Sequence, residues 1–451
     1  MPRKSKNFNW YLSRTKIIVA GFVAIILIGT LLLMLPFSTR EGEQTTFSGA
    51  LFTSVSAGCV TGLVVYDTCT HWTLFGQLVI LALIQIGGLG FVTIGVFALT
   101  MSRKKIGLGG RELIHDSLST LQVRGSVRLV RRIVFGTAIF EGMGAVLLAV
   151  RFIPQMGVGK GIYYAVFHSV SAFCNAGFDL MGYKGQYSSF CGYVFDPLVN
   201  FVLMALIIIG GIGFIVWEDV LDNKWHFKRY RFQTKIVLTS TAVLIFGSAI
   251  LFFALEYDGL FAGMELKDSI LAALFCAVTP RTAGFNTVDT AALSNGSTIL
   301  TIFLMFIGGS PGSTAGGIKT TTLVVILLYV KSYLFNEKDL AAFRRRLDGD
   351  AIKRACVVVF VNYLLALAGG TVIMSVQSDL PFRDIIFEVF SAIGTVGMST
   401  GVTRDLNILS RIVIILLMFC GRVGSLTFAM SFTRRRQIGS LRYPEEQITV
   451  G

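Results

Sequence analysis

The sequence predicts an all-α polytopic membrane protein in which four tandem repeats surround a central pore. Its 451 residues have a mean hydropathy of +0.70, and 53% are hydrophobic while only 15% are charged. A soluble domain of this size carries far more charge on its surface. Apolar runs of about 20 residues, the length that a helix needs to cross a bilayer, recur along the chain. The eight strongest runs are 17–36, 74–100, 133–154, 197–217, 236–255, 299–330, 355–376 and 408–432.

Basic residues collect in alternate connections between these runs. Of the 40 Lys and Arg residues, 30 lie in five groups, within 3–16, 103–132, 224–235, 319–354 and 434–442. Because this distribution follows the positive-inside rule, we expect a multi-pass protein of the cell membrane with both termini in the cytoplasm. The same distribution accounts for the net charge of +14, so we expect no nucleic-acid partner.

The connections on the outer side repeat one pattern four times. Each has a short amphipathic stretch and then a turn of small residues that contains a glycine. The glycines are Gly62, Gly177, Gly284 and Gly397, which lie 115, 107 and 113 residues apart. Each repeat is therefore expected to hold a first span, a short helix, a glycine turn and a second span. The predicted boundaries are 1–100, 101–222, 223–335 with a broken second span, and 336–433, followed by a cytoplasmic tail, 434–451.

The short stretches cannot cross a membrane. Residues 47–56, for example, form about 15 Å of helix against a hydrocarbon core of about 30 Å. Length alone allows either a helix on the outer surface or a re-entrant pore helix. Four copies that all end in the same glycine turn favour four re-entrant pore helices. Non-helical backbone at membrane depth is tolerated where protein buries it or where it lines a watery cavity, and four such turns around an axis would create that cavity.

We expect the four glycine turns to form a selectivity filter for a cation. A dehydrated cation needs oxygens in place of its water shell, and a ring of backbone carbonyls supplies them without fixed charge. Glycine tolerates the backbone angles that such loops need, and the C-terminal ends of the four short helices favour a cation electrostatically. The predicted filter residues are Val60, Thr61, Gly62, Asn175, Ala176, Gly177, Thr282, Ala283, Gly284, Thr395, Val396 and Gly397.

The sixth apolar run contains a second unusual segment. Ten residues that include five glycines and a proline interrupt it: Gly308, Gly309, Ser310, Pro311, Gly312, Ser313, Thr314, Ala315, Gly316 and Gly317. A helix cannot continue through them cheaply, since each glycine costs about 1 kcal/mol and proline about 3 kcal/mol. A simple flexible kink is one alternative. A phosphate-binding loop is another, but Ile318 separates the glycines from Lys319-Thr320, and no strand is predicted before them.

The second spans of the other repeats carry smaller glycine breaks at the corresponding place. They are Gly87-Gly88-Leu89-Gly90, Gly210-Gly211-Ile212-Gly213 and Gly421-Arg422-Val423-Gly424. Close helix packing explains the glycines but not Arg422. An arginine deep in a span costs roughly 2.5–3.5 kcal/mol and usually faces an interior or a cavity. We expect Arg422 to act in the pore, and the alternative is a structural ion pair, for instance with Glu141.

With these motifs in place, the whole chain resembles the superfamily of potassium transporters that includes the Trk, Ktr and plant HKT proteins. It is most similar to the KtrB branch, which has eight spans and a short N-terminus, and the tail that begins Tyr443-Pro444-Glu445-Glu446 is also similar. In that family a filter glycine stands in each loop, at the positions of Gly62, Gly177, Gly284 and Gly397. Serine in the first loop accompanies sodium preference in the plant relatives, so four glycines imply potassium.

The resemblance has further implications for gating and partners. It implies that residues 308–317 obstruct the pore under the filter, that Arg422 tunes passage nearby, and that two copies form a homodimer, each with its own pore. A separate cytosolic ring subunit of the RCK type, which binds ATP or ADP, would control conduction. The basic connections 103–132, 224–235 and 331–354 are candidate docking surfaces for it. We expect no cofactor in this chain; K⁺ is the transported ion, and sodium coupling or activation is implied by the family alone.

Two alternative functions remain at the level of sequence. A sodium-selective or non-selective cation transporter would share this fold, and sequence does not separate a channel from a coupled transporter. A membrane-embedded enzyme would need clustered acid, base or metal-binding groups. The four histidines, His71, His115, His168 and His226, are widely spread, and HExxH does not occur. We therefore do not expect an enzyme.

Overall fold

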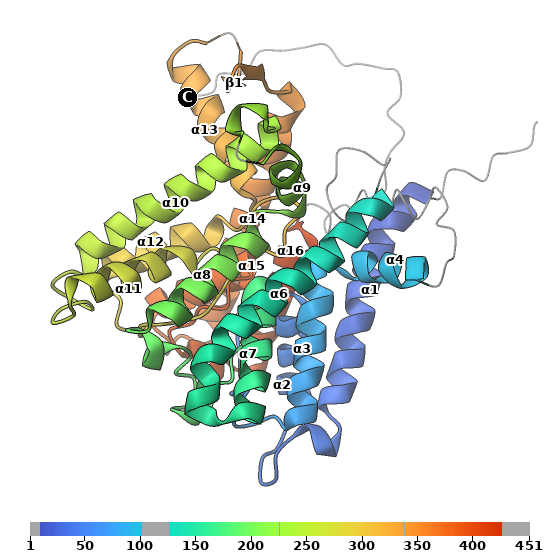
Figure 1. Cartoon of the computed structure of the whole chain (residues 1–451), viewed down its shortest axis with the longest axis vertical. Helices are drawn as coiled ribbons and strands as arrows, with labels where there is room; N and C mark the ends of the chain where they lie inside the picture. Colours follow the sequence, from blue (N-terminus) through green and yellow to red (C-terminus); the bar gives the residue numbers. More distant parts are fainter. Residues whose placement is uncertain (1–9, 102–125, 225, 338, 426–451) are drawn as a thin grey trace, which may run out of the picture.

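The computed structural model describes residues 10–101, 126–224, 226–337 and 339–425, and the all-α prediction is confirmed (Figure 1). The only strands in these residues are the two-residue β1 and β2, Ala341–Ala342 and Arg345–Arg346. The α-helices are α1 Trp10–Leu33, α2 Phe47–Gly58, α3 Leu74–Leu89, α4 Phe91–Met101, α6 Ser126–Met156, α7 Val158–Phe173, α8 Pro197–Gly211, α9 Phe214–Asn223, α10 Phe232–Glu256, α11 Leu266–Val278, α12 Asn295–Phe306, α13 Thr320–Leu334, α14 Gly349–Val376, α15 Phe382–Gly394 and α16 Ile408–Val423. Short 3₁₀ turns lie at Pro36–Ser38, Met181–Tyr183, Cys191–Tyr193, Phe227–Arg229 and Val402–Arg404.

The first helix of each repeat is long and apolar enough to cross a membrane. These four helices are α1, α6, α10 and α14, with spans of 18, 30, 25 and 28 residues. Their outward faces carry exposed large apolar side chains, such as Leu31 on α1 and Ile139 on α6, each 66% exposed. Exposed apolar side chains along a helix that satisfies its own backbone are what a lipid environment requires.

The second helices of the repeats are bent or short. The chain turns by 92° between α3 and α4 and by 97° between α8 and α9, at Gly90 and Gly213, whose φ angles are +80° and +99°. The glycine breaks predicted in 74–100 and 197–217 are therefore full bends, because a glycine in the left-handed region ends one helix and redirects the next. Counting each bent pair as one span raises the candidate spans in the described residues from four to six. The helices α12 and α13 are shorter apolar segments, and α16 ends near the limit of the described chain.

The short helices α2, α7, α11 and α15 sit inside the assembly of longer helices. Within the repeats, α1 packs on α2, α6 on α7, α10 on α11 and α14 on α15. Between repeats, α3 contacts α7, α8 contacts α11, α12 contacts α15, and α16 contacts α2. These last four contacts close a circle, so the described parts of the four repeats surround a common axis.

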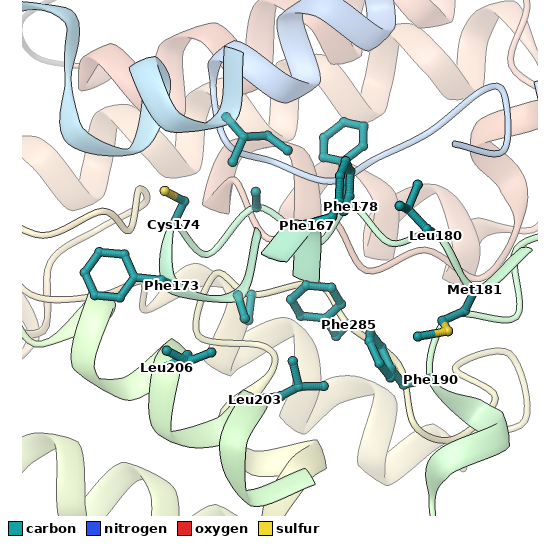
Figure 2. Packing of buried hydrophobic residues seen from close by; sticks show 14 of the residues in the cluster. Phe167, Phe173, Cys174, Phe178, Leu180, Met181, Phe190, Leu203, Leu206 and Phe285 are labelled. Carbon is teal, nitrogen blue, oxygen red and sulfur yellow. The ribbon is translucent and has the colours of Figure 1, made fainter. Parts of the chain in front are cut away.

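Aromatic and aliphatic side chains fill the space behind the central loops. Figure 2 shows Phe178, Phe285 and Phe190 gathered near the loops, with Leu203 and Leu206 projecting from α8 on the same side. All five are at most 4% exposed, and the rings of Phe190 and Phe285 meet edge to face at 5.5 Å. Dense packing of this kind holds loop backbone in place where regular secondary structure is absent.

Candidate functional site

The four glycines that the repeat pattern singled out meet in one ring. A Cβ atom added to each glycine would meet the carbonyl oxygen just before the glycine of the next repeat. It would lie 2.6 Å from the Ala176 oxygen when added to Gly62, and 2.8 Å from the Ala283 oxygen when added to Gly177. On Gly284 and Gly397 it would overlap the oxygens of Val396 and Thr61, respectively. The contacts run in the order of the repeats and return to the first, so a side chain at any of the four positions would force the neighbouring loop to shift.

The backbone of all four loops has the same unusual conformation. The φ angles of Gly62, Gly177, Gly284 and Gly397 are +98°, +69°, +78° and +90°. Two residues before each glycine, Val60, Asn175, Thr282 and Thr395 also have positive φ, between 51° and 75°. Such angles are rare outside glycine, and they mark strain for β-branched residues such as valine and threonine. Left-handed residues at alternate positions turn successive carbonyl groups toward one side of a loop.

The amide groups of these loops are bonded back to the pore helices. The nitrogens of Thr61, Ala176 and Val396 each donate to a serine carbonyl oxygen at 2.8 Å, those of Ser56, Ser171 and Ser391. In the third loop Ala283 N donates to Thr279 O at 2.9 Å. Hydroxyl groups of Ser56 and Ser391 also accept from Gly62 N and Gly397 N, both at 3.1 Å.

The carbonyl groups of the predicted filter residues, unlike their amide groups, have no hydrogen-bond partner in the described residues. Among the hydrogen bonds of the described residues, none uses a carbonyl oxygen of the twelve predicted filter residues as acceptor. Buried backbone carbonyls normally find a partner, so a ring of oxygens without one stands out. The arrangement leaves those oxygens available to a ligand that accepts electron pairs, which means a cation.

A cavity of about 270 Å³ opens on one side of the ring. All four glycines line it, together with Asp67, Asp179 and Asp289 and a single basic residue, Arg404. The Asp67 carboxylate accepts backbone bonds from Cys69 N and Tyr187 N, both at 2.9 Å, and thereby joins the first and second repeats. Burial raises the pKa of Asp179 to about 7, but Asp67 and Asp289 alone outnumber the one guanidinium, so the cavity raises the local concentration of cations at the mouth of the ring.

On the other side of the repeat-4 loop lies the glycine-rich segment between α12 and α13. A Cβ added to Gly316 would overlap the Thr395 hydroxyl, and one added to Gly317 would lie 3.0 Å from Gly394 O. The segment is fastened to α8 by Ser310 N, which donates to Gly211 O at 2.9 Å, and by Thr314 N, which donates to Gly210 O at 3.2 Å. The structure therefore brings the predicted gate residues against the predicted filter, where a loose kink would have left them unattached.

Arg422 fastens the same segment to the first repeat. Its guanidinium donates to the carbonyl oxygens of Thr314, Gly87 and Gly88, the last at 3.0 Å. The alternative of an ion pair with Glu141 does not hold: the Glu141 carboxylate accepts from Gln85 Nε2 at 3.2 Å, and no bond to Arg422 is found in the described chain. Arg422 thus supplies hydrogen bonds to carbonyl groups at the end of α3 and in the segment 308–317.

Sequence reasoning missed a second cation at this segment. Lys319 Nζ donates to Ala315 O at 2.8 Å and to Gly316 O at 3.2 Å. Its signal was a lysine directly after a glycine-rich break inside an apolar run, which the phosphate-loop alternative used for a different purpose. That alternative is wrong, because α12 precedes the glycines instead of a strand, and the lysine binds the loop's own carbonyls.

Comparison with known proteins decides the family. The sequence profile of the TrkH family, described as cation transport protein, matches residues 3–438. The chain belongs to the TrkH family. It is 41% identical to the potassium/sodium uptake protein NtpJ of Enterococcus hirae over 98% of both chains. It is 40% identical to the Ktr system potassium uptake protein B of Bacillus subtilis over 100% of this chain and 99% of that one. TrkH membership makes the protein a multi-pass membrane cation transporter and not an enzyme.

A solved structure agrees with the TrkH assignment at the level of fold. The potassium transporter TrkH from Vibrio parahaemolyticus superposes with a TM-score of 0.74 over 96% of this chain and 87% of that chain, at 18% identity. The family profile and the two relatives confirm the resemblance to the Trk and Ktr transporters.

Proposed function

We propose that the chain is the pore-forming subunit of a potassium uptake system. The observation that carries this proposal is the closed ring of four glycine loops, whose amides are bonded to the pore helices and whose carbonyls have no partner in the described residues. The names of its relatives support the choice of ion, since the B. subtilis protein is a potassium uptake protein and NtpJ a potassium/sodium uptake protein.

In this proposal K⁺ enters through the cavity that Asp67, Asp179 and Asp289 line. The ion sheds water against carbonyl oxygens of residues 60–62, 175–177, 282–284 and 395–397, which replace its hydration shell. The C-terminal ends of α2, α7, α11 and α15 point their negative dipole ends toward the ion beyond the ring. The membrane potential supplies about 2.3 kcal/mol per charge for each 100 mV.

The segment 308–317 is the gate in this scheme. It lies against Thr395 of the filter loop, and two cationic side chains, Arg422 and Lys319, bond its carbonyl oxygens. Bonds from Thr314 and Ser310 to α8 hold it closed, and movement of α8 or α16 would release it. A cytosolic ring subunit of the RCK type, which binds ATP or ADP, is the proposed source of that movement.

The proposal extends to assembly and topology. Two copies form a homodimer in the cell membrane, and both termini face the cytoplasm. The boundaries of the four repeats at 100, 222, 335 and 433 stay a prediction. Part of the basic connection 103–132 and the whole tail 434–451 lie outside the described residues, so their roles in docking and dimer contacts are carried by the resemblance alone.

Uptake by a bacterial strain that lacks its own potassium systems tests the proposal. The chain is expressed with and without a Ktr ring subunit, beside a Gly62→Ser variant. We expect the wild type to restore growth at low potassium, and the serine variant to lose its preference for K⁺. Sodium flux in place of potassium flux would favour the sodium-selective or non-selective alternative. If no cation moves even with the ring subunit present, the inference from four loops to a pore is wrong.

A further inference from the structure

The four pore helices differ at one equivalent position. Nine residues before each ring glycine stand Thr53, His168, Phe275 and Glu388. All four side chains are at most 1% exposed. The four repeats share the ring glycine and the positive φ angles of the loop. They differ in the side chain at this buried position, which faces the loop from the pore helix.

In the second repeat, His168 connects α7 to the chain beyond the ring. Its Nδ1 lies 2.7 Å from the carbonyl oxygen of Tyr164, one helical turn earlier, and its Nε2 accepts from the backbone N–H of Leu180 at 2.9 Å. Only the neutral ring with its proton on Nδ1 can make both bonds. Leu180 follows Gly177 by three residues and is fully buried, so its amide has no access to water.

Glu388 makes the corresponding connection in the fourth repeat. Its Oε1 accepts from the Thr403 hydroxyl, and Thr403 Oγ1 also lies 3.0 Å from the hydroxyl of Ser399, two residues past Gly397. Thr403 and Glu388 are 2% and 1% exposed. A side chain of the pore helix therefore ties down the chain that leaves the ring, as in the second repeat but through a carboxylate and a hydroxyl.

At this helix position the first and third repeats make no such connection among the described residues. The third loop is tied elsewhere, by Thr279 at the end of α11, whose Oγ1 donates to Phe285 O at 2.6 Å. Thr53 Oγ1 donates at 2.9 Å to Gly49 O inside its own helix, and Phe275 has no polar group to offer. The ring contacts run through the repeats in order, so the second and fourth loops face each other across the axis. The two loops that are bonded from this helix position are therefore a diagonal pair.

We propose that His168 and Glu388 are positioning residues that set the ion preference of the ring. The inference rests on the proposed function and deepens it. A carbonyl ring discriminates against Na⁺ when its loops cannot close around the smaller ion. The hydrogen bonds of His168 and Glu388, on opposite sides of the axis, hold the second and fourth loops at the spacing that suits K⁺. Without them the loops move inward, and Na⁺ gains oxygen contacts that the intact ring denies it.

The purified full-length chain in liposomes gives the test, with K⁺ and Na⁺ fluxes measured on the same preparation. His168→Phe keeps a buried ring but removes the acceptor for Leu180 N–H, and Thr403→Val keeps the shape but removes the donor to Glu388. His168→Gln and Glu388→Gln keep an acceptor oxygen at the reach of Nε2 and Oε1. Thr53→Val and Phe275→Leu alter the same helix position in the first and third repeats, where it makes no bond to the chain beyond the ring.

We expect His168→Phe and Thr403→Val to raise the Na⁺/K⁺ flux ratio by roughly tenfold, the effect of one lost hydrogen bond. The two glutamine variants and the two matched controls should stay within about twofold of the wild type, which is a few tenths of a kcal/mol. A merely structural role would lower both fluxes together and leave the ratio unchanged.

An unchanged ratio in a folded, K⁺-transporting His168→Phe or Thr403→Val protein overturns the inference. If His168→Phe does not fold, Thr403→Val decides alone, because Thr403 lines the cavity and lies outside the pore helix. An equal rise in the Thr53→Val control would also contradict it, since the effect would then not belong to the diagonal pair. A wild type that moves no K⁺ overturns the proposed function itself, which the variants do not address.

Discussion

The filter ring and the glycine-rich segment 308–317 are both non-helical backbone in the centre of the molecule, yet they treat their carbonyl groups in opposite ways. In the ring, the pore helices take the amides, and the carbonyl oxygens have no partner in the described part of the chain. In the segment, side chains and neighbouring amides bond the carbonyls: Arg422 bonds Thr314 O, Lys319 bonds Ala315 O, and Phe214 N donates to Gly312 O at 2.7 Å.

This difference separates carbonyl groups that are open to a ligand from carbonyl groups that the protein itself bonds. Arg422 and Lys319 are cations fixed to the protein, and they hold the oxygens that a mobile cation would otherwise use. Glycine permits both conformations, so composition alone does not distinguish the two regions. What distinguishes them is whether a donor of the protein, such as a basic side chain or a backbone amide, lies within reach of the carbonyl oxygens. Substitutions in the ring or in the segment 308–317 test this difference, and the largest effect is expected in the ring.

Gly397→Ala should break the ring. A Cβ there overlaps the carbonyl oxygen of Thr61, and φ is +90°. Overpacking costs about 1–3 kcal/mol and left-handed backbone about 1–2 kcal/mol more, so we expect K⁺ uptake to fall by more than ~tenfold. Gly247→Ala in α10, where an added Cβ meets nothing within 4 Å, is the matched control and should transport normally. Normal uptake by Gly397→Ala would mean that the ring is not the narrow point of the pathway.

Arg422→Gln should loosen the segment and raise K⁺ flux in the absence of any ring subunit. The guanidinium bonds three carbonyl oxygens, and hydrogen bonds to charged groups contribute about 1.5–3 kcal/mol, so an increase of ~tenfold or more is expected. Arg422→Lys should give an intermediate flux, because a single ammonium cannot reach both Thr314 and the break in α3. Flux below that of the wild type would show that Arg422 assists passage.

Lys319→Met should act in the same direction with a smaller effect. Methionine keeps most of the side-chain volume but releases the oxygens of Ala315 and Gly316. The loss of about 1 kcal/mol corresponds to a rise of ~fivefold in basal flux through the full-length chain in liposomes. A Lys319→Met protein that conducts as little as the wild type would leave Arg422 as the cation that keeps the segment closed.

His71 should give the smallest effect, on stability and not on flux. It lies in the outer connection, with Nε2 at 2.8 Å from Thr45 Oγ1 and Nδ1 at 3.2 Å from Glu43. Burial lowers the pKa of His71 below its ordinary value of 6.5, and Glu43 and Asp67 oppose part of that shift. The unfolded chain therefore takes up the proton first, so the stabilisation is complete above pH 6.5 and is lost as the pH falls through the lowered pKa.

The melting temperature of the wild type should accordingly fall by about 2 °C more than that of His71→Gln between pH 7.5 and pH 5.5. Glutamine keeps an acceptor for Thr45 but cannot be protonated. Parallel acid curves for the two proteins would mean that His71 does not titrate between the folded and unfolded states in this range.

The repeat pattern allowed the meeting of the four glycines to be predicted, since one glycine in each outer turn marks a position where two loops approach closely. The break at Gly308 was equally visible, because five glycines and a proline cannot continue a helix. The bends at Gly90 and Gly213 were underestimated. Glycine in a span signals either close packing or a turn, and only the neighbouring backbone decides which.

Contacts between distant residues could not be predicted in the same way. Arg422 and Gly87 are 335 residues apart, and nothing local in either segment indicates the other. His168 and Glu388 sit at equivalent positions, yet one pairs with a backbone amide and the other with a hydroxyl. The sequence suggested for Lys319 only a phosphate-binding loop. Its actual partners are carbonyl groups, which every residue possesses, so no sequence pattern marks them. Sequence shows where a helix stops, but not which distant group satisfies the exposed backbone.

The four loops of the ring belong to one chain, and each has its own sequence. In a pore made from four identical subunits, a single codon change alters every quarter of the opening at once. Here the same change alters one quarter, and three intact quarters remain. In the proposed pore, a change in one loop can therefore alter ion preference while the other three loops keep their sequence. The unlike side chains behind its two pairs of loops are the kind of divergence that such a gene permits.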